Sequence, residues 1–197
     1  MRKQFIAAAT ATALAFSLAA CGADDADTAG PEEPGTADVA VNFNEADVQF
    51  AQGMIPHHEQ AVEMSNIILD KERIDPRVTE LAEQIKEAQE PEIELLESWL
   101  DEWDASPAVM DDMHDGHGME GMMSSDDIDA LTIAEGESAA RLYIEQMIVH
   151  HEGAIIMAEA QLQTGANSAA LELAQTIIDT QQTEIDSMRM LLNDLDS

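Results

Sequence analysis

The histidines and methionines of this chain are the residues whose types and spacing could do chemistry. All 6 His occur in three close pairs, and the chain holds 12 Met. In two pairs, His57/His58 and His150/His151, a Met lies three residues before the first His. Thioether sulfur is a soft ligand that suits Cu(I), and imidazole suits copper in both common oxidation states. The pattern therefore indicates a site for a soft, thiophilic cation.

These two His pairs lie in a longer motif that occurs twice, MIPHHEQAVEM at 54–64 and MIVHHEGAIIM at 147–157. On a helix of 3.6 residues per turn, both His of each pair flank the apolar stripe and not the solvent face. The alternative is a structural role, with hydrogen-bonded core His and gap-filling Met. The candidate ligands of the two copies are Met54, His57, His58, Met64, Met147, His150, His151 and Met157.

A segment rich in Met and His separates the two copies, over residues 105–124. Exposed thioethers in a flexible acidic loop gain nothing from hydrophobic burial, so we interpret them as a second set of soft-metal ligands. The alternatives are Met residues that pack on the rest of the fold, or a low-complexity spacer. The candidate ligands here are Met110, Met113, His114, His117, Met119, Met122 and Met123.

Helices must position these residues, because the hydrophobic spacing is helical and strand signals are absent. Capping residues predict helix starts at Asn44, at Asp75 and at Asn167 or Ser168, with a further helical stretch from Ser124 or Ser125 that is interrupted near Gly136. The sequence predicts an all-α, four-helix bundle built from two repeated hairpins, at about 44–104 and about 125–194.

Four polar residues lie on the apolar stripes of the second and fourth long helices: Gln89, Glu92, Gln181 and Glu184. Gln181 and Glu184 follow Gln89 and Glu92 at an offset of 92 residues, against 93 for the motif itself. Polar groups on such a stripe need partners. We expect them either to orient the imidazoles or to lie at the rim. Trp99 and Trp103, at a helix end, are expected to be exposed for contact.

The first residues carry a targeting signal. Arg2 and Lys3 precede an apolar stretch at 5–18 that is too short to span a bilayer. It ends in Leu-Ala-Ala-Cys-Gly at 18–22, which resembles a bacterial lipobox with Cys21 as the lipidated residue. The sequence predicts a lipoprotein signal peptide at 1–21, a flexible acidic tether at 22–43 and a domain at 44–197. The alternative is an ordinary signal peptide with an incidental Cys.

Composition excludes several function classes. With 41 acidic and 8 basic residues in 197, the net charge is −33, which argues against nucleic acid and anionic membrane surfaces as partners. Membrane contact is expected through the lipid anchor only. A single Cys allows no intrachain disulfide. His58-Glu59 and His151-Glu152 resemble the start of a zincin motif, but the second His of that motif is missing from both. No phosphate-binding loop or activated nucleophile is present, so we expect binding and not catalysis.

The duplicated motif resembles the signature of a bacterial family, domain of unknown function 305, over roughly residues 44–194. The resemblance implies a ferritin-like helical bundle that binds Cu(I), Cu(II) or Ag(I) through the Met and His of the two motifs. The family includes periplasmic copper-binding proteins of the CopM type, associated with copper resistance.

The leading hypothesis is a lipid-anchored, extracytoplasmic copper-binding protein for buffering, resistance or delivery. A ferritin-like metal oxidase is one alternative, and an acidic interaction module that binds no metal is another. The sequence leaves the oligomeric state and the delivery partner open.

Overall fold

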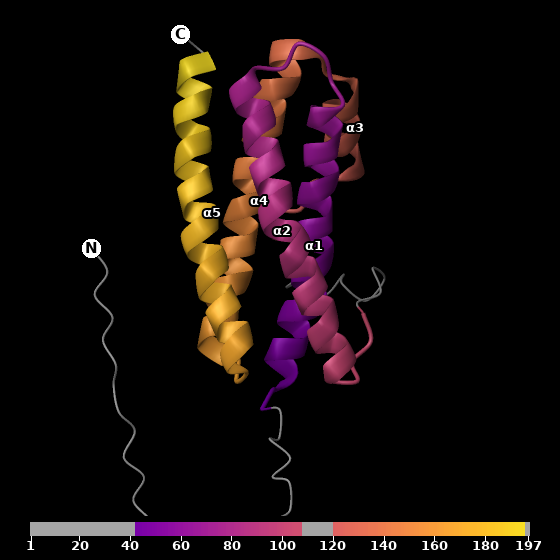
Figure 1. Ribbon diagram of the computed structural model, residues 1–197, viewed down its shortest axis with the longest axis vertical. Helices are drawn as coiled ribbons and strands as arrows, with labels where there is room; N and C mark the ends of the chain where they lie inside the picture. The colour runs from indigo at the N-terminus through magenta and orange to yellow at the C-terminus, as the bar shows by residue number, and fades with distance from the viewer. Residues whose placement is uncertain (1–41, 108–119, 196–197) are drawn as a thin grey trace, which may run out of the picture. The chain divides into compact units, whose positions relative to one another are not determined.

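The computed structural model describes residues 42–107 and 120–195, and these residues form five α-helices and no strand. Four helices are long, and they run side by side with the short α3 next to them (Figure 1). α1 packs against α2 and α4, and α4 packs against α5. The predicted all-α bundle of two helical hairpins is confirmed. The helices are α1 (Glu45–Leu69), α2 (Pro76–Glu102), α3 (Ser125–Ile133), α4 (Gly136–Thr164) and α5 (Ser168–Leu195).

Three long helices begin at the capping residues from which the sequence analysis predicted their starts. The Asn44 side chain accepts from the Asp47 amide, and the Asp47 carboxylate accepts from the Asn44 amide at 2.8 Å, which forms a capping box at α1. Asp75 caps α2, with Pro76 at the first helical position. The Asn167 side chain accepts two amide hydrogen bonds at the start of α5.

The predicted interruption near Gly136 is also present. Ser124 and Asp127 form a capping box that starts α3. α3 ends at Ile133, and α4 starts at Gly136, whose φ of +54° lies in the left-handed region that favours glycine. A short additional helix thus precedes α4, and the described residues before α1, 42–44, form no such helix.

The core consists of two apolar clusters separated by polar residues. The Trp-side cluster contains Met54, Trp99, Trp103 and Met157, and the Tyr-side cluster contains Met64, Tyr143 and Met147. Each long helix passes from one cluster to the other and carries polar residues at the crossing. We call these residues the polar layer: His57, His58, Gln89, Glu92, His150, His151, Gln181 and Glu184.

The two ends of the bundle differ despite the repeat. At the Tyr-side end, the Tyr143 and Ser65 hydroxyls share a buried hydrogen bond of 2.9 Å. The residues related to them by the repeat, Phe50 and Ala158, lie in the Trp-side cluster and are apolar. The buried Asp47 accepts backbone hydrogen bonds from Ala166 and Asn167, which fixes the start of α1 against the α4–α5 turn.

The expectation that Trp99 and Trp103 are exposed is wrong. Their side chains are only 7% and 6% exposed. The Trp103 ring stacks between Phe43, at a centroid distance of 5.0 Å, and Trp99, at 5.8 Å. Phe43 precedes the first helix, so helical periodicity gave no sign that it covers this end of the core.

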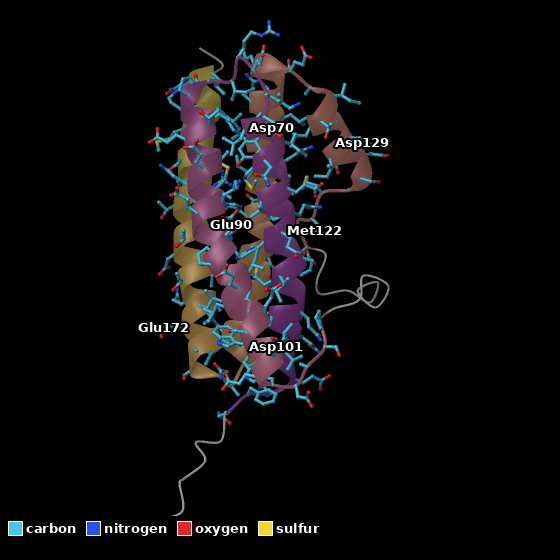
Figure 2. The ribbon with its side chains drawn as sticks, turned by 45° about the vertical axis from the view of Figure 1, so that its right-hand side comes forward. Asp70, Glu90, Asp101, Met122, Asp129 and Glu172 are labelled. Atoms are coloured by element: carbon cyan, nitrogen blue, oxygen red, sulfur yellow. The ribbon has the colours of Figure 1, made fainter. Side chains whose placement is uncertain are left out.

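Acidic side chains cover the outside of the bundle. Asp70, Glu90, Asp101, Asp129 and Glu172, from three of the helices and one turn, are all exposed (Figure 2). Among the described residues, no helix has the length and apolar character needed to cross a bilayer. The predicted signal segment 1–21 with Cys21, and the predicted tether up to residue 41, lie outside the described residues.

Candidate metal centre

The four helical His meet in the middle of the bundle. α1 supplies His57 and His58, α4 supplies His150 and His151, and all four side chains are 0% exposed. The ring centroids of His57 and His150 lie 3.8 Å apart, and those of His150 and His151 lie 6.4 Å apart. The structure therefore places the imidazoles from both repeats in one layer, on the core side that the helical spacing predicted.

Two of these imidazoles are held by glutamates in the same way. Nε2 of His58 lies 2.7 Å from a carboxylate oxygen of Glu92, and Nε2 of His151 lies 2.7 Å from one of Glu184. A carboxylate only accepts, so each Nε2 donates its hydrogen. In the neutral ring the lone pair is then on Nδ1. The two glutamates thus orient the imidazoles, as one of the two sequence interpretations held.

His57 is held by a backbone carbonyl. Its Nε2 donates to the carbonyl oxygen of Glu120 at 3.1 Å, which again leaves the lone pair on Nδ1. Glu120 begins a segment, residues 120–123, that lies across α1 and α4 and that we call the strap. The Gln60 side chain binds the backbone of Met123 through hydrogen bonds of 2.9 Å and 2.7 Å, which fastens the end of the strap to α1.

Two glycines let the strap approach α4 closely. A Cβ on Gly153 would lie 2.0 Å from the Glu120 carbonyl oxygen, and a Cβ on Gly121 would lie 2.5 Å from the Val149 carbonyl oxygen. Gly121 also has a φ of +75°, which glycine adopts without strain. This backbone-to-backbone contact holds the Glu120 carbonyl against His57.

Most buried polar atoms without a hydrogen-bond partner in the described residues belong to the polar layer. They include Nδ1 of His57, His58 and His151, and both ring nitrogens of His150. Gln89 and Gln181, each 3% exposed, contribute further unpaired amide atoms. Leaving buried nitrogen lone pairs unpaired costs free energy, and a bound cation would satisfy them. The donor set therefore fits a metal ion.

The electrostatics of the layer favour the neutral form of His57 and His150. Burial, followed by the neighbouring His58, lowers the pKa of His57 to about 3. Burial also lowers the pKa of His150 well below 6.5, with His57 as the next cause. A neutral imidazole is the form that binds metal ions. These two side chains therefore present free lone pairs at neutral pH.

The four motif methionines flank the layer on both sides. Met54 and Met157, one from each repeat, lie in the Trp-side cluster. Met64 and Met147 lie together in the Tyr-side cluster. Each side of the polar layer thus has thioether sulfur from both halves of the chain.

Within residues 42–107 and 120–195, no three or more His, Cys, Asp and Glu side chains are arranged to hold a metal ion. A metal site in the polar layer must therefore include thioether sulfur, or it must form by rotation of the imidazole rings. A mixed set of sulfur and imidazole donors favours Cu(I) over harder cations.

The linker ligands are described only in part. Met122 and Met123 are half-buried on the strap, and Met123 packs against the Tyr-side cluster, as the packing alternative predicted for it. Five linker candidates lie outside the described residues: Met110, Met113, His114, His117 and Met119.

Sequence reasoning missed the strap and its partners. Gln60 lies inside the first motif but is not a candidate ligand, Glu120 belongs to neither motif, and a carbonyl acceptor leaves no trace in side-chain chemistry. Gly153 is the signal that could have been used, because glycine inside a helix is unfavourable and often marks a close backbone approach.

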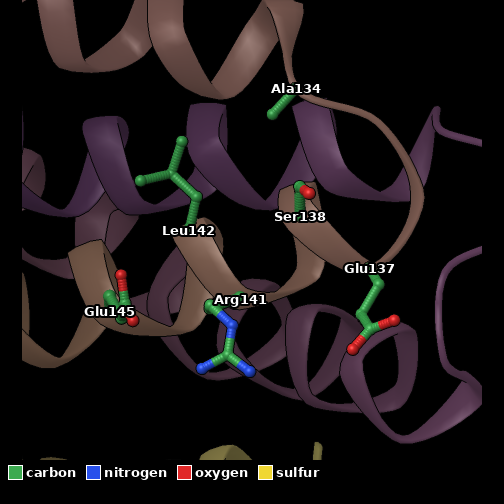
Figure 3. Close-up of a pocket in the computed structure, with 6 residues that line it drawn as sticks. All are labelled: Ala134, Glu137, Ser138, Arg141, Leu142 and Glu145. Carbon is green, nitrogen blue, oxygen red and sulfur yellow. The ribbon is translucent and has the colours of Figure 1, made fainter. Parts of the chain in front are cut away.

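A separate hollow of about 410 Å³ lies beside the α3–α4 turn (Figure 3). Its lining includes Glu137, Ser138, Arg141 and Glu145, and no His or Met. It offers no soft donors and is distinct from the polar layer.

The fold and the site define a duplicated helical bundle with a His- and Met-lined centre. The model of one family, the domain of unknown function DUF305, matches residues 47–192. The chain belongs to the DUF305 family.

Solved structures agree with this assignment. A DUF305 protein of Streptomyces coelicolor, described as secreted, is 32% identical, with a TM-score of 0.72 over 77% of this chain and 94% of that chain. CopM in its Cu(II)-bound form is 32% identical, with a TM-score of 0.65 over 75% of this chain and 96% of that chain. CopM is also solved in Cu(I)-bound and Ag-bound forms.

One curated relative matches a shorter stretch. An uncharacterized protein of Acanthamoeba polyphaga mimivirus is 45% identical over 56 residues, which is 28% of this chain. The chain spans about a third of the length of that relative, 36%.

Proposed function

We propose that this chain is an extracytoplasmic copper-binding protein that holds Cu(I), and also Cu(II) or Ag(I), in its polar layer. The ligands are the imidazoles of His57, His58, His150 and His151 with thioethers from the flanking Met54, Met64, Met147 and Met157. The role is binding for buffering, resistance or delivery, and not turnover.

The observation that carries the proposal is the set of buried, unpaired imidazole nitrogens contributed by both repeats. Glu92, Glu184 and the Glu120 carbonyl hold three of the four rings by Nε2. Metal-bound imidazoles usually donate their other N–H to a carboxylate or carbonyl in this way. The copper- and silver-bound forms of the similar CopM support the choice of cation.

Location is part of the same proposal. The signal segment with Cys21 indicates export and lipid anchoring, and the likeness to a DUF305 protein described as secreted supports export. A lipid at Cys21 would be the chain's membrane contact, with the acidic tether between the lipid and the bundle.

The test is titration of the chain lacking residues 1–21 with Cu(I) and Ag(I), under competition with a chelator. Comparison with a variant in which all four helical His are changed to Ala measures the contribution of the layer. The milder pair His58→Gln and His151→Gln keeps polar side chains in place, and circular dichroism checks the helical content. Equal binding by wild type and variants would contradict the proposal. Oxygen consumption on addition of Cu(I), with more than one Cu(I) oxidised per chain, would instead favour the oxidase.

A further inference from the structure

The polar layer is closed to solvent at its imidazoles, so a cation must pass between helices to reach it. A groove of about 310 Å³ lies between the N-terminal half of α1 and the C-terminal half of α4. Its lining includes Phe50 from α1, Glu120 from the strap, and Ile156, Met157 and Gln161 from α4. We call it the α1–α4 groove.

The α1–α4 groove ends at a candidate ligand. Of the eight Met and His residues of the two motifs, Met157 is the only one with exposed surface, at 8% against 0% for the others. Its thioether therefore reaches both the groove and the Trp-side cluster that borders the polar layer.

Two further lining residues bring polar groups to the groove. The Glu120 carbonyl accepts the hydrogen bond from His57, so the strap joins the groove wall to an imidazole. The Gln161 side chain is 2% exposed, and its carbonyl oxygen has no hydrogen-bond partner. A buried acceptor of this kind can stabilise a passing cation.

The repeat-related position at the other end of the bundle is covered. Phe50 and Met157 correspond to Tyr143 and Met64, which are both 0% exposed. α3 provides the cover, since its Leu131 is fully buried in the Tyr-side cluster. Residues 42–107 include no counterpart of α3, and among the described residues the α1–α4 seam is hollowed at its Trp-side end and filled at its Tyr-side end.

We propose that the α1–α4 groove is the mouth through which a soft monovalent cation, Cu(I) or Ag(I), reaches and leaves the polar layer, with the Met157 thioether as its first ligand. The inference rests on the proposed function. The groove residues set the rate of exchange, and the ligands of the layer set the affinity.

The experiment measures release of bound Cu(I) from the full chain into excess bathocuproine disulfonate, followed by absorbance of the chelate. Ile156→Trp narrows the groove at a position that is 50% exposed, so the new ring need not enter the core. Val149→Trp is the matched control, on the same helix, 49% exposed and outside the groove. Blocking a path slows uptake and release by the same factor, and the affinity stays unchanged.

We expect Ile156→Trp to slow release about tenfold, which corresponds to about 1.4 kcal/mol of added barrier, with unchanged copper per chain. Val149→Trp should release copper at the wild-type rate. Ala160→Trp, at an exposed groove position, is the second variant if Ile156→Trp fails to fold.

Release at the wild-type rate by the groove variants would overturn the inference and leave the proposed function intact. Equal slowing by Val149→Trp would also overturn it, because the effect would not be specific to the groove. A wild-type chain that holds no Cu(I) would overturn the proposed function itself, and this outcome is visible before any variant is compared.

Discussion

At the scale of single residues, a hydrogen bond donated by Nε2 of a neutral imidazole leaves the lone pair on Nδ1. Glu92 and Glu184 act on His58 and His151 from repeat-related positions, at the same 2.7 Å. Their side chains are 19% and 16% exposed, so each carboxylate connects solvent with a buried ring. A negatively charged hydrogen-bond acceptor on Nε2 makes Nδ1 a stronger electron-pair donor to a metal ion.

We expect Glu92→Gln and Glu184→Gln each to weaken Cu(I) binding by about tenfold or more, because the amide keeps the shape and removes the charge. Chelator competition measures the change. Glu90→Gln, an exposed neighbour on α2, removes the same charge away from the layer and should have little effect. Identical losses in Glu90→Gln and Glu92→Gln would show that general surface charge, and not imidazole orientation, was responsible.

The buried imidazoles also predict how the metal-free fold responds to acid. The pKa of His57 is lowered to about 3 by burial and that of His150 is lowered well below 6.5, with His58, His151, Glu92 and Glu184 in the same layer. In the unfolded chain both pKa values return to about 6.5. Below that pH the unfolded state binds more protons, so the free energy of unfolding falls as pH falls, by about 1.4 kcal/mol per pH unit for each such His.

We therefore expect the urea midpoint of the metal-free chain to drop between pH 7 and pH 5. The drop should be smaller in His150→Leu, which removes one buried titrating group and fills the space with an apolar side chain. The same pH dependence in wild type and variant would contradict this assignment of the acid sensitivity.

At the scale of elements, the strap is the part of the site that the repeat does not explain. It supplies the acceptor for His57, and its approach to α4 depends on Gly121 and Gly153. His150, the repeat-related partner of His57, has no equivalent acceptor among the described residues, where both its ring nitrogens are unpaired. The two halves of the layer are therefore alike in their His–Glu pairs and unlike at their centre.

Gly153→Ala tests the strap contact through the direction in which it changes the free energy of unfolding. Alanine normally stabilises a helix interior by about 0.5–1 kcal/mol relative to glycine. Here its Cβ would lie 2.0 Å from a backbone oxygen, so we expect a lower melting temperature, with a loss of about 1–3 kcal/mol. Ala160→Gly gives the ordinary propensity effect on the same helix. A stabilised Gly153→Ala would contradict the close contact.

The helices and the inward position of the His were predictable because they depend on local signals. Capping pairs such as Asn44–Asp47 act within one turn, and the spacing of His57 and His58 from Met54 fixes their side of the helix. Contacts between distant segments determine the position of the strap carbonyl, the burial of Trp103 under Phe43 and the hydrogen bonds that Asp47 accepts from the α4–α5 turn. Those contacts have no periodic signature, so the sequence alone did not indicate them.

At the scale of the whole molecule, a chain with a net charge of −33 contains a buried centre of imidazole and thioether donors. The acidic surface raises the local concentration of cations without selecting among them. Selection then falls to the polar layer, where sulfur and imidazole favour copper over Ca²⁺ or Mg²⁺. A cation that binds only the folded chain also stabilises it, by about 2.7 kcal/mol at a hundredfold excess over Kd.

The central claim is that copper binds inside the bundle, at the His nitrogens that have no hydrogen-bond partner. Anomalous diffraction at the copper edge, from crystals of the chain loaded with Cu(I), tests it most directly. We expect a peak in the polar layer, bonded to imidazole Nδ1 atoms from both α1 and α4. A peak found only at surface carboxylates, with His57, His58, His150 and His151 free of metal, would contradict it.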